Sequence, residues 1–173
     1  FIGIEWVARG DDFLKAKNIY LYLSWVSLFK GKPEVKKVTI EDGHLHLYTD
    51  ACGYRNLNLV EQVDAQKGEG STPVLTMRRT RLIMENELLN AKHDIEVEYL
   101  HGDVTKQDST VLLDIDIRSL VHGIGFNLEK GSYLKEKTLQ GNLLLTYFPH
   151  QKLELTKVNL NIQQHPYILH GAF

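Results

Sequence analysis

Residues 34–49 show most clearly the hydrophobic pattern that recurs along the chain. Apolar residues two positions apart occur on both sides of a central dipeptide: Val38, Ile40, Leu45 and Leu47. A period of two places such side chains on one face of a β-strand. The central dipeptide, Asp42-Gly43, is typical of a turn, because glycine accepts positive φ without steric cost. The pattern therefore predicts a β-hairpin over residues 34–49.

A similar sequence pattern recurs near the end of the chain. Residues 154–160 match residues 34–40 as acidic, apolar, polar, Lys, Val, polar, apolar, and the apolar segment 167–169 follows. The match indicates one hairpin design that is used repeatedly.

Alternation of apolar and polar residues predicts further strands along most of the chain. They are expected at residues 1–7, 17–23, 56–60, 74–85, 94–99, 111–117, 139–147 and 152–162. Turns are expected at residues 10–12 and 101–103. Thr156-Lys157 shifts the apolar parity, as a β-bulge does. Long alternation with one charged face favours an antiparallel sheet with one solvated side.

One short helix is predicted at about residues 24–30. Ser24 is a suitable N-cap, Gly31 a suitable residue just after the helix, and Pro33 prevents continuation. So short a helix is not stable alone. We therefore expect three of its side chains to dock over an end of the sheet: Trp25, Leu28 and Phe29.

The polar, glycine-containing segment 64–73 is predicted to be a flexible loop. It separates residues 1–63, a hairpin unit with the short helix, from residues 74–173, a second β-rich part of the same sheet. One helix is too little to cover a large one-sided sheet. The sheet must therefore bend onto itself, pack against a second sheet, or leave apolar surface for a ligand or partner. The residues alone predict an all-β fold with a mostly antiparallel sheet built of repeated hairpins; its curved groove is implied by the resemblance described below.

Composition narrows the function classes. The formal net charge is −2, from 20 basic and 22 acidic residues without a basic stripe, which disfavours nucleic acid. Cys52 is the single cysteine, so no intramolecular disulfide or cysteine-based zinc site is possible. No apolar run approaches the roughly 20 residues that span a bilayer. Because the chain starts at Phe1 without methionine and ends on apolar Phe173, we expect a fragment whose upstream anchor is missing.

The sequence offers little catalytic chemistry. His44 and His46 share a strand face with Tyr48 at a spacing that suits a metal, but the additional ligands of a site are not evident. Two pairs of carboxylates have the same spacing, and both fit a solvated strand face: Glu96 with Glu98, and Asp114 with Asp116. No nucleophile motif or glycine-rich phosphate loop is present. We expect no enzyme activity, no metal and no cofactor.

Two other clusters have two interpretations each. Arg78, Arg79 and Arg81 suit phosphate head groups, or form an ordinary charged surface. Tyr20, Tyr22 and Trp25 suit a sugar-binding platform, or cross-strand packing.

Residues 24–59 resemble the AsmA-like family of Gram-negative envelope proteins. The resemblance rests on a helix end, two strands and a loop in a fixed order: Ser24, Leu28, Gly31 and Lys32, then Val35, Val38 and Ile40, then Leu45 and Leu47, then Asp50, Gly53 and Asn56. Segments 100–104 and 168–173 are similar to later parts of such proteins.

The resemblance implies a long, bent sheet with an apolar groove, as in bridge-like lipid transport proteins. It also implies a periplasmic location, an N-terminal inner-membrane anchor in the full-length protein, and a role in phospholipid transport and outer-membrane biogenesis. The predicted partner is a phospholipid or another acyl-chain lipid.

The predicted lining residues of that groove are the apolar members of the alternating strands. They are Ile19, Leu21, Leu23, Val38, Ile40, Leu45, Leu47, Ile95, Val97, Val111, Leu113, Ile115, Leu143, Leu145, Val158 and Leu160. The other interpretation of each is plain core packing. Two alternatives for the whole chain are an extracellular carbohydrate-binding β-sandwich and a structural scaffold that joins modules edge to edge.

Overall fold

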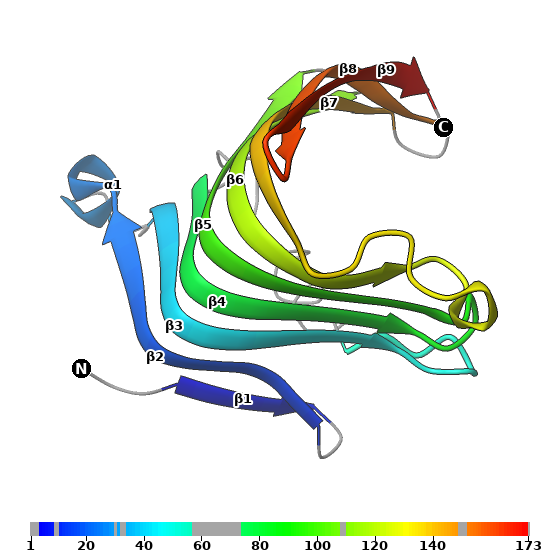
Figure 1. Cartoon of the computed structure of the whole chain (residues 1–173). Coiled ribbons are helices and arrows are strands. Elements are labelled where there is room, and N and C mark those ends of the chain that lie inside the picture. Colours follow the sequence, from blue (N-terminus) through cyan, green and yellow to red (C-terminus); the bar gives the residue numbers. More distant parts are fainter. Residues whose placement is uncertain are drawn as a thin grey trace.

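A computed structural model describes residues 4–8, 11–29, 31, 34–56, 74–107, 110–148 and 152–172. These residues form one nine-stranded sheet whose strands follow one another in sequence order (Figure 1). The strands are β1 Ile4–Ala8, β2 Asp11–Leu23, β3 Val35–Thr49, β4 Val74–Asn86, β5 Ala91–Gln107, β6 Thr110–Gly125, β7 Lys137–Phe148, β8 Lys152–Ile162 and β9 His165–Ala172. The remaining elements are the helix α1, Trp25–Phe29, and the 3₁₀ helix η1, Leu128–Lys130. The predicted all-β class is confirmed.

The sheet is mostly antiparallel, as predicted. Seven of its neighbouring strand pairs are antiparallel, and only β3 with β4 is parallel. A parallel pair needs a connection that returns along the sheet. This connection includes residues 57–73, so the strand expected at 56–60, apart from its first residue, and the loop expected at 64–73 lie outside the described residues.

The predicted hairpin at residues 34–49 is wrong, because β3 is one continuous strand. Asp42 does take a left-handed φ of 52°, as a turn residue would. However, β3 keeps the same neighbours on both sides of this position: Ile40 opposes Ile19 of β2, and Leu45 opposes Leu14 of the same strand. The left-handed residue therefore bends the strand without reversing it.

The turn predicted at residues 101–103 is also wrong, because these residues continue β5. At residues 10–12 the prediction is displaced: β1 and β2 are antiparallel with Ala8 opposite Asp11, so Asp11 and Asp12 already belong to β2, and Gly10 lies outside the described residues. The bulge predicted at Thr156-Lys157 is confirmed by a register shift between Leu155 and Val158 where β8 pairs with β9.

The bend continues across three strands. Arg79 of β4 lies beside Asp42 and has a φ of 47°, and the pairing of β5 with β6 shifts at Glu98, between Val97 and Tyr99. We call Asp42, Arg79 and Glu98 the crease. Figure 1 shows β3, β4 and β5 bending near their middle, with β7 to β9 curling round at one end of the sheet.

Apolar side chains stay on one face on both sides of the crease. A Cβ on Gly43 would lie 3.1 Å from Ile40 Cγ2 and 3.4 Å from Ala16 Cβ. In a regular strand, residues 40 and 43 point to opposite faces. Here they share a face and approach each other, so the strand bends toward its apolar side.

The core lies at this bend. A cluster of buried residues gathers there: Phe13, Leu14, Ala16, Ile40, Met77 and Val97. Val97 has no exposed surface, although it belongs to a single sheet. Within the described residues, each strand makes its extensive contacts with its sheet neighbours alone. Side chains on the inside of the bend therefore cover one another, as a second layer would, but they do so only near the bend.

The helix forms as predicted, but the docking predicted for Trp25 and Phe29 is wrong. Trp25 is 76% exposed and Phe29 is 89% exposed. The side chain of Leu28, the third residue of that prediction, lies outside the described part of the chain. Hydrogen bonds at the helix base tie α1 to the residue before β3. Ser24 N–H donates to the Glu34 carbonyl at 3.0 Å, and Ser27 Oγ donates to the Ser24 carbonyl at 2.7 Å. Figure 1 shows α1 projecting from the end of β2.

Candidate functional site

The register aligns apolar residues in rows that cross the sheet. Directly opposed residues on neighbouring strands share a face. One row runs through Ile19, Ile40, Met77, Leu100, Ile117, Gly141, Leu160 and Tyr167. The next runs through Leu21, Val38, Leu75, Gly102, Ile115, Leu143, Val158 and Leu169. We call the side that carries these rows the apolar face.

Across the crease the apolar face continues. A further row runs through Leu14, Leu45, Leu82, Ile95 and Val121. The register thus brings the predicted lining residues to one face, apart from Leu23. A register shift after Tyr22 pairs Leu23 with Val35, so its face is not fixed by the pairing.

Burial divides the predicted lining residues into three groups. Ile40 and Val97 are buried in the core cluster at the bend, and Val158 is buried outside that cluster, on β8. Leu21 and Leu23, at the end of β2, are 60% and 40% exposed. The others are half-buried: Ile19, Val38, Leu45, Leu47, Ile95, Val111, Leu113, Ile115, Leu143, Leu145 and Leu160. The apolar face is therefore closed by side chains at the bend and at Val158, and most of its other predicted lining residues are partly exposed.

Sequence reasoning missed the contribution of β4. Its apolar residues change parity at Arg79, so no single alternation covers the strand: Leu75 and Met77, then Leu82 and Met84. Residues 38–47 make the same change of parity at Asp42. The shared change of parity in these two segments was a signal in the sequence. It would have identified both the bend and the missed apolar residues of β4.

The opposite side, the polar face, carries ion pairs between neighbouring strands. Arg79 Nε donates to Asp42 Oδ1 at 2.6 Å, and Arg118 Nη1 lies 3.3 Å from Glu98 Oε1. The hydrogen bond from Arg79 lowers the pKa of Asp42, against a smaller opposing effect of burial. These pairs give the outer side of the crease alternating charge from strand to strand.

The other arginines of the predicted phosphate cluster are also paired. Arg81 donates to both carboxylate oxygens of Asp94, at 3.0 and 2.7 Å, and its hydrogen bond lowers the pKa of Asp94. Arg78 Nη1 lies 3.5 Å from Glu41 Oε1. Carboxylates thus occupy the geometry that a phosphate would need, which favours the interpretation as a charged surface.

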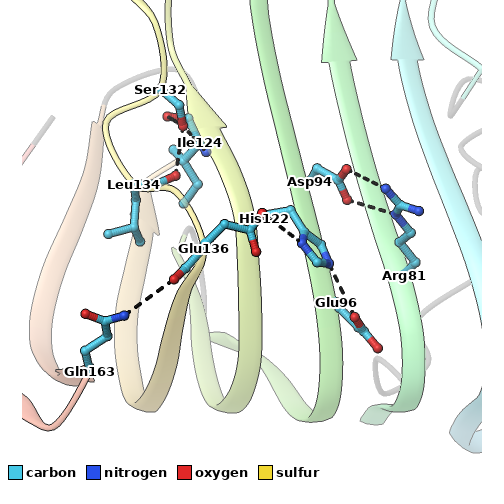
Figure 2. A network of polar contacts seen from close by, with 9 residues as sticks. All are labelled: Arg81, Asp94, Glu96, His122, Ile124, Ser132, Leu134, Glu136 and Gln163. Carbon is cyan, nitrogen blue, oxygen red and sulfur yellow. Dashed lines mark hydrogen bonds and ion pairs between the residues drawn. The ribbon is translucent and has the colours of Figure 1, made fainter.

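A second polar network joins β5, β6 and the residues around the start of β7 (Figure 2). His122 lies 3.3 Å from the carboxylate oxygens of both Glu96 and Glu136. Burial lowers the pKa of His122, but hydrogen bonds to Glu136 and Glu96 outweigh it, and the pKa is raised. Gln163 Nε2 donates to the Glu136 carbonyl at 3.4 Å, which joins this network to the β8–β9 turn.

Ser132 completes this network (Figure 2). Its Oγ donates to the Leu134 carbonyl at 2.8 Å and accepts from the Ile124 N–H at 3.0 Å. The segment after β6 is therefore tied back along the edge of that strand.

The predicted metal pair, His44 and His46, lies near one carboxylate, that of Glu85. His44 and His46 stack with ring centroids 6.5 Å apart, and His46 Nε2 lies 3.4 Å from Glu85 Oε2. The hydrogen bond from Lys92 lowers the pKa of Glu85, so that carboxylate already has a cationic partner. Among the described residues, no three acidic, histidine or cysteine side chains gather as a metal site would require.

The predicted sugar platform is divided between two elements. Tyr20 and Tyr22 oppose Thr39 and Lys37 on the polar face, and Lys37 Nζ lies 5.6 Å from the centre of the Tyr22 ring. Trp25 belongs to α1.

A depression of about 760 Å³ does lie beside the crease, lined mostly by polar side chains that include Arg79, Glu96, Glu98, Arg118, Gln140 and Asn161. Arg118 and Glu98 neutralise each other there, and no aromatic side chain lines it.

Comparisons with known proteins add no family. No protein-family model matches the chain, and no curated protein matches it. Among the described helices, none is long and apolar enough to cross a membrane. The candidate site is therefore the apolar face, identified by its geometry.

Proposed function

We propose that this chain is a non-enzymatic lipid-binding module that holds the acyl chains of phospholipid, or of a similar lipid, along its apolar face. One observation carries the proposal. Apolar rows cross the sheet from β2 to β9, and away from the bend they stay partly exposed, with no second layer among the described residues. Continuous exposed apolar surface of this kind is typical of a binding site.

An acyl chain fits such a surface energetically. Burial of each CH₂ group contributes about 0.8 kcal/mol. Apolar burial is also non-directional, so a chain can slide along the rows without breaking specific bonds. These properties suit transport of lipid better than recognition of one head group.

The wider assignment rests on the resemblance of residues 24–59 to the AsmA-like family. On that basis we propose a periplasmic location, an inner-membrane anchor in the full-length protein, and a role in phospholipid transport and outer-membrane biogenesis. The bent, open sheet supports this proposal.

The two alternatives differ in what they require. A carbohydrate-binding sandwich requires two packed sheets, whereas the described residues form one. A structural scaffold requires the open apolar rows to be covered by other protein, with no lipid bound.

The deciding experiment is native mass spectrometry, with lipid extraction, of the chain purified from a Gram-negative periplasm. The test variant is Leu113→Glu with Leu145→Glu, because these leucines oppose each other on the half-buried part of the apolar face. The control is Leu112→Glu with Leu144→Glu, which places the same substitutions on the polar face of the same two strands.

We expect phospholipid to co-purify with the wild type and with the control, and to be lost from the test variant. Circular dichroism establishes that both variants fold. A lipid-free wild-type monomer, or equal lipid on both variants, contradicts the proposed function and favours the scaffold.

A further inference from the structure

The helix α1 presents a cluster of exposed apolar side chains at one end of the sheet. Trp25, Val26 and Phe29 are 76%, 63% and 89% exposed. The end of β2 adds Leu21 and Leu23, of which Leu21 belongs to an apolar row. We call these five residues the tip. The tip is thus an extension of the apolar face beyond the sheet.

The exposure of the tip is built into the fold. Glu34 N–H donates to Ser27 Oγ at 2.9 Å, and the Glu34 carbonyl accepts from Ser24 N–H at 3.0 Å. These bonds fix both sides of the helix base to the start of β3. Because polar contacts hold the helix base, the aromatic side chains of Trp25 and Phe29 stay largely exposed.

Positive charge surrounds the tip in the sequence. Residues 24–37 contain four lysines and one glutamate, whereas the whole chain has a net charge of −2. Lys36 pairs with Glu34 at 2.7 Å, and Lys37 lies over the ring of Tyr22. The local excess of lysine is complementary to anionic lipid head groups.

We propose that the tip docks on the surface of an anionic phospholipid bilayer. Tryptophan is enriched at the level of the head groups, and apolar side chains flanked by lysine are typical of segments that lie in the membrane interface. Trp25 and Phe29 enter the boundary between head groups and acyl chains, while Lys36 and Lys37, at the start of β3, stay with the phosphates. A bilayer surface suits these features better than a protein partner, which would need a complementary pocket for each aromatic side chain.

Docking at the tip would place the Leu21 end of the apolar rows against the bilayer. In this respect the inference rests on the proposed function, since it gives the groove its source of lipid. The two ideas nevertheless fail separately, because docking is measured on vesicles and groove occupancy by mass spectrometry.

The test is flotation of the full chain with vesicles of phosphatidylcholine mixed with phosphatidylglycerol, compared with vesicles of phosphatidylcholine alone. The test variant is Trp25→Ser with Phe29→Ser. The control is Leu88→Ser with Leu89→Ser, which removes two exposed leucines from the turn at the far end of β4. We expect the test variant to bind roughly a hundredfold more weakly than wild type, and the control to bind as wild type does.

Two further readouts sharpen the test. In a Trp6→Phe background Trp25 is the only tryptophan, and we expect its fluorescence to shift to the blue on anionic vesicles. Added salt weakens binding if the lysines contribute. Equal binding of the test variant and the control, or absence of binding by wild type, overturns the proposal.

A second copy of the chain is the alternative partner. The docking proposal is overturned in its favour if Trp25 fluorescence is blue-shifted without vesicles and sedimentation shows dimers that the Trp25→Ser, Phe29→Ser variant does not form. Loss of vesicle binding with retained lipid in native mass spectrometry supports docking at the tip and leaves the groove intact. Lipid lost from Leu113→Glu with Leu145→Glu, while that variant still floats, separates the two sites.

Discussion

At the scale of single residues, the spacing between strands depends on positions that lack a side chain. Gly141 of β7 opposes Leu160 of β8, in the row that also contains Ile40 and Met77. A Cβ at Gly141 would overlap the Asn159 carbonyl of the neighbouring strand. Gly171 of β9 also pairs with β8, but a Cβ there meets nothing within 4 Å.

We therefore predict that Gly141→Ala destabilises the fold, because β7 and β8 must separate to admit the methyl group. Overpacking of this kind costs about 1–3 kcal/mol of the free energy of unfolding. Gly171→Ala is the matched control, with an expected change within about 0.5 kcal/mol. Urea unfolding followed by circular dichroism measures both. Equal losses in the two variants would show that the close approach at Gly141 has no energetic consequence.

His122 makes a contribution to stability that depends on pH. Its folded pKa is raised by Glu136 and Glu96, despite the opposing effect of burial. The protonated imidazole therefore stabilises the folded state fully below the unfolded pKa of about 6.5, and this stabilisation is lost as the pH rises through the folded pKa.

We predict that His122→Gln lowers the free energy of unfolding by a few tenths of a kcal/mol at about pH 5.5, since its carboxylate partners are largely exposed. The difference from wild type should shrink at about pH 8.5. In a background of Glu96→Gln with Glu136→Gln, the effect of His122→Gln should no longer be larger at pH 5.5 than at pH 8.5, because burial then lowers the pKa of His122 without the opposing hydrogen bonds. A larger effect at pH 5.5 that persists in that background would assign the pH dependence to other groups.

At the scale of elements, the sequence predicted strand type and face better than strand ends. Alternation alone identified the apolar residues of β3, because a period of two determines which side chains share a face. It did not identify β3 as one strand, because Asp42-Gly43 has the chemistry of a turn and the local sequence does not contain the neighbours of β3. Pairing with β2 and β4 along both halves decides that the strand continues.

The sequence also could not predict how far each side chain of the apolar face is exposed. Ile40 and Leu113 look alike in the sequence, yet Ile40 is buried inside the bend and Leu113 is half-buried beyond it. The difference comes from the left-handed residues of the crease and from the register between distant strands. Exposure of Trp25 and Phe29 was missed for a related reason, since the sequence does not show the hydrogen bonds that tie the helix base to Glu34.

The crease itself can be tested by the backbone preference of Asp42. Valine at a φ of 52° is strained because of its β-branched side chain, whereas glycine adopts this φ freely. We predict that Asp42→Val lowers the melting temperature by roughly 2–8 °C relative to Asp42→Gly. Both variants lose the bond to Arg79, so the comparison isolates the backbone. Equal melting temperatures would mean that the bend does not require a left-handed residue at this position.

At the scale of the whole molecule, the edge strand β9 carries few of the features that usually protect an open edge. All eight residues of β9 are exposed, and none of them is aspartate, glutamate, lysine or arginine. Tyr167, Ile168 and Leu169 are 47%, 68% and 45% exposed. Unpaired edges without charges favour pairing with another strand, and Pro166 is the one edge-protecting residue of β9.

We predict that the isolated chain self-associates through β9 as its concentration rises. Sedimentation velocity should show an increase in average mass, which Ile168→Lys reduces because a charge then sits on the exposed edge. Asn159→Lys is the matched control: Asn159 opposes Ile168 on β8, so the same charge lies on the same face but one strand inside the edge. We expect this control to associate as wild type does. If both variants associate equally, the contact lies elsewhere; a wild type that stays monomeric throughout would show that Pro166 and the curl of the sheet suffice to protect this edge.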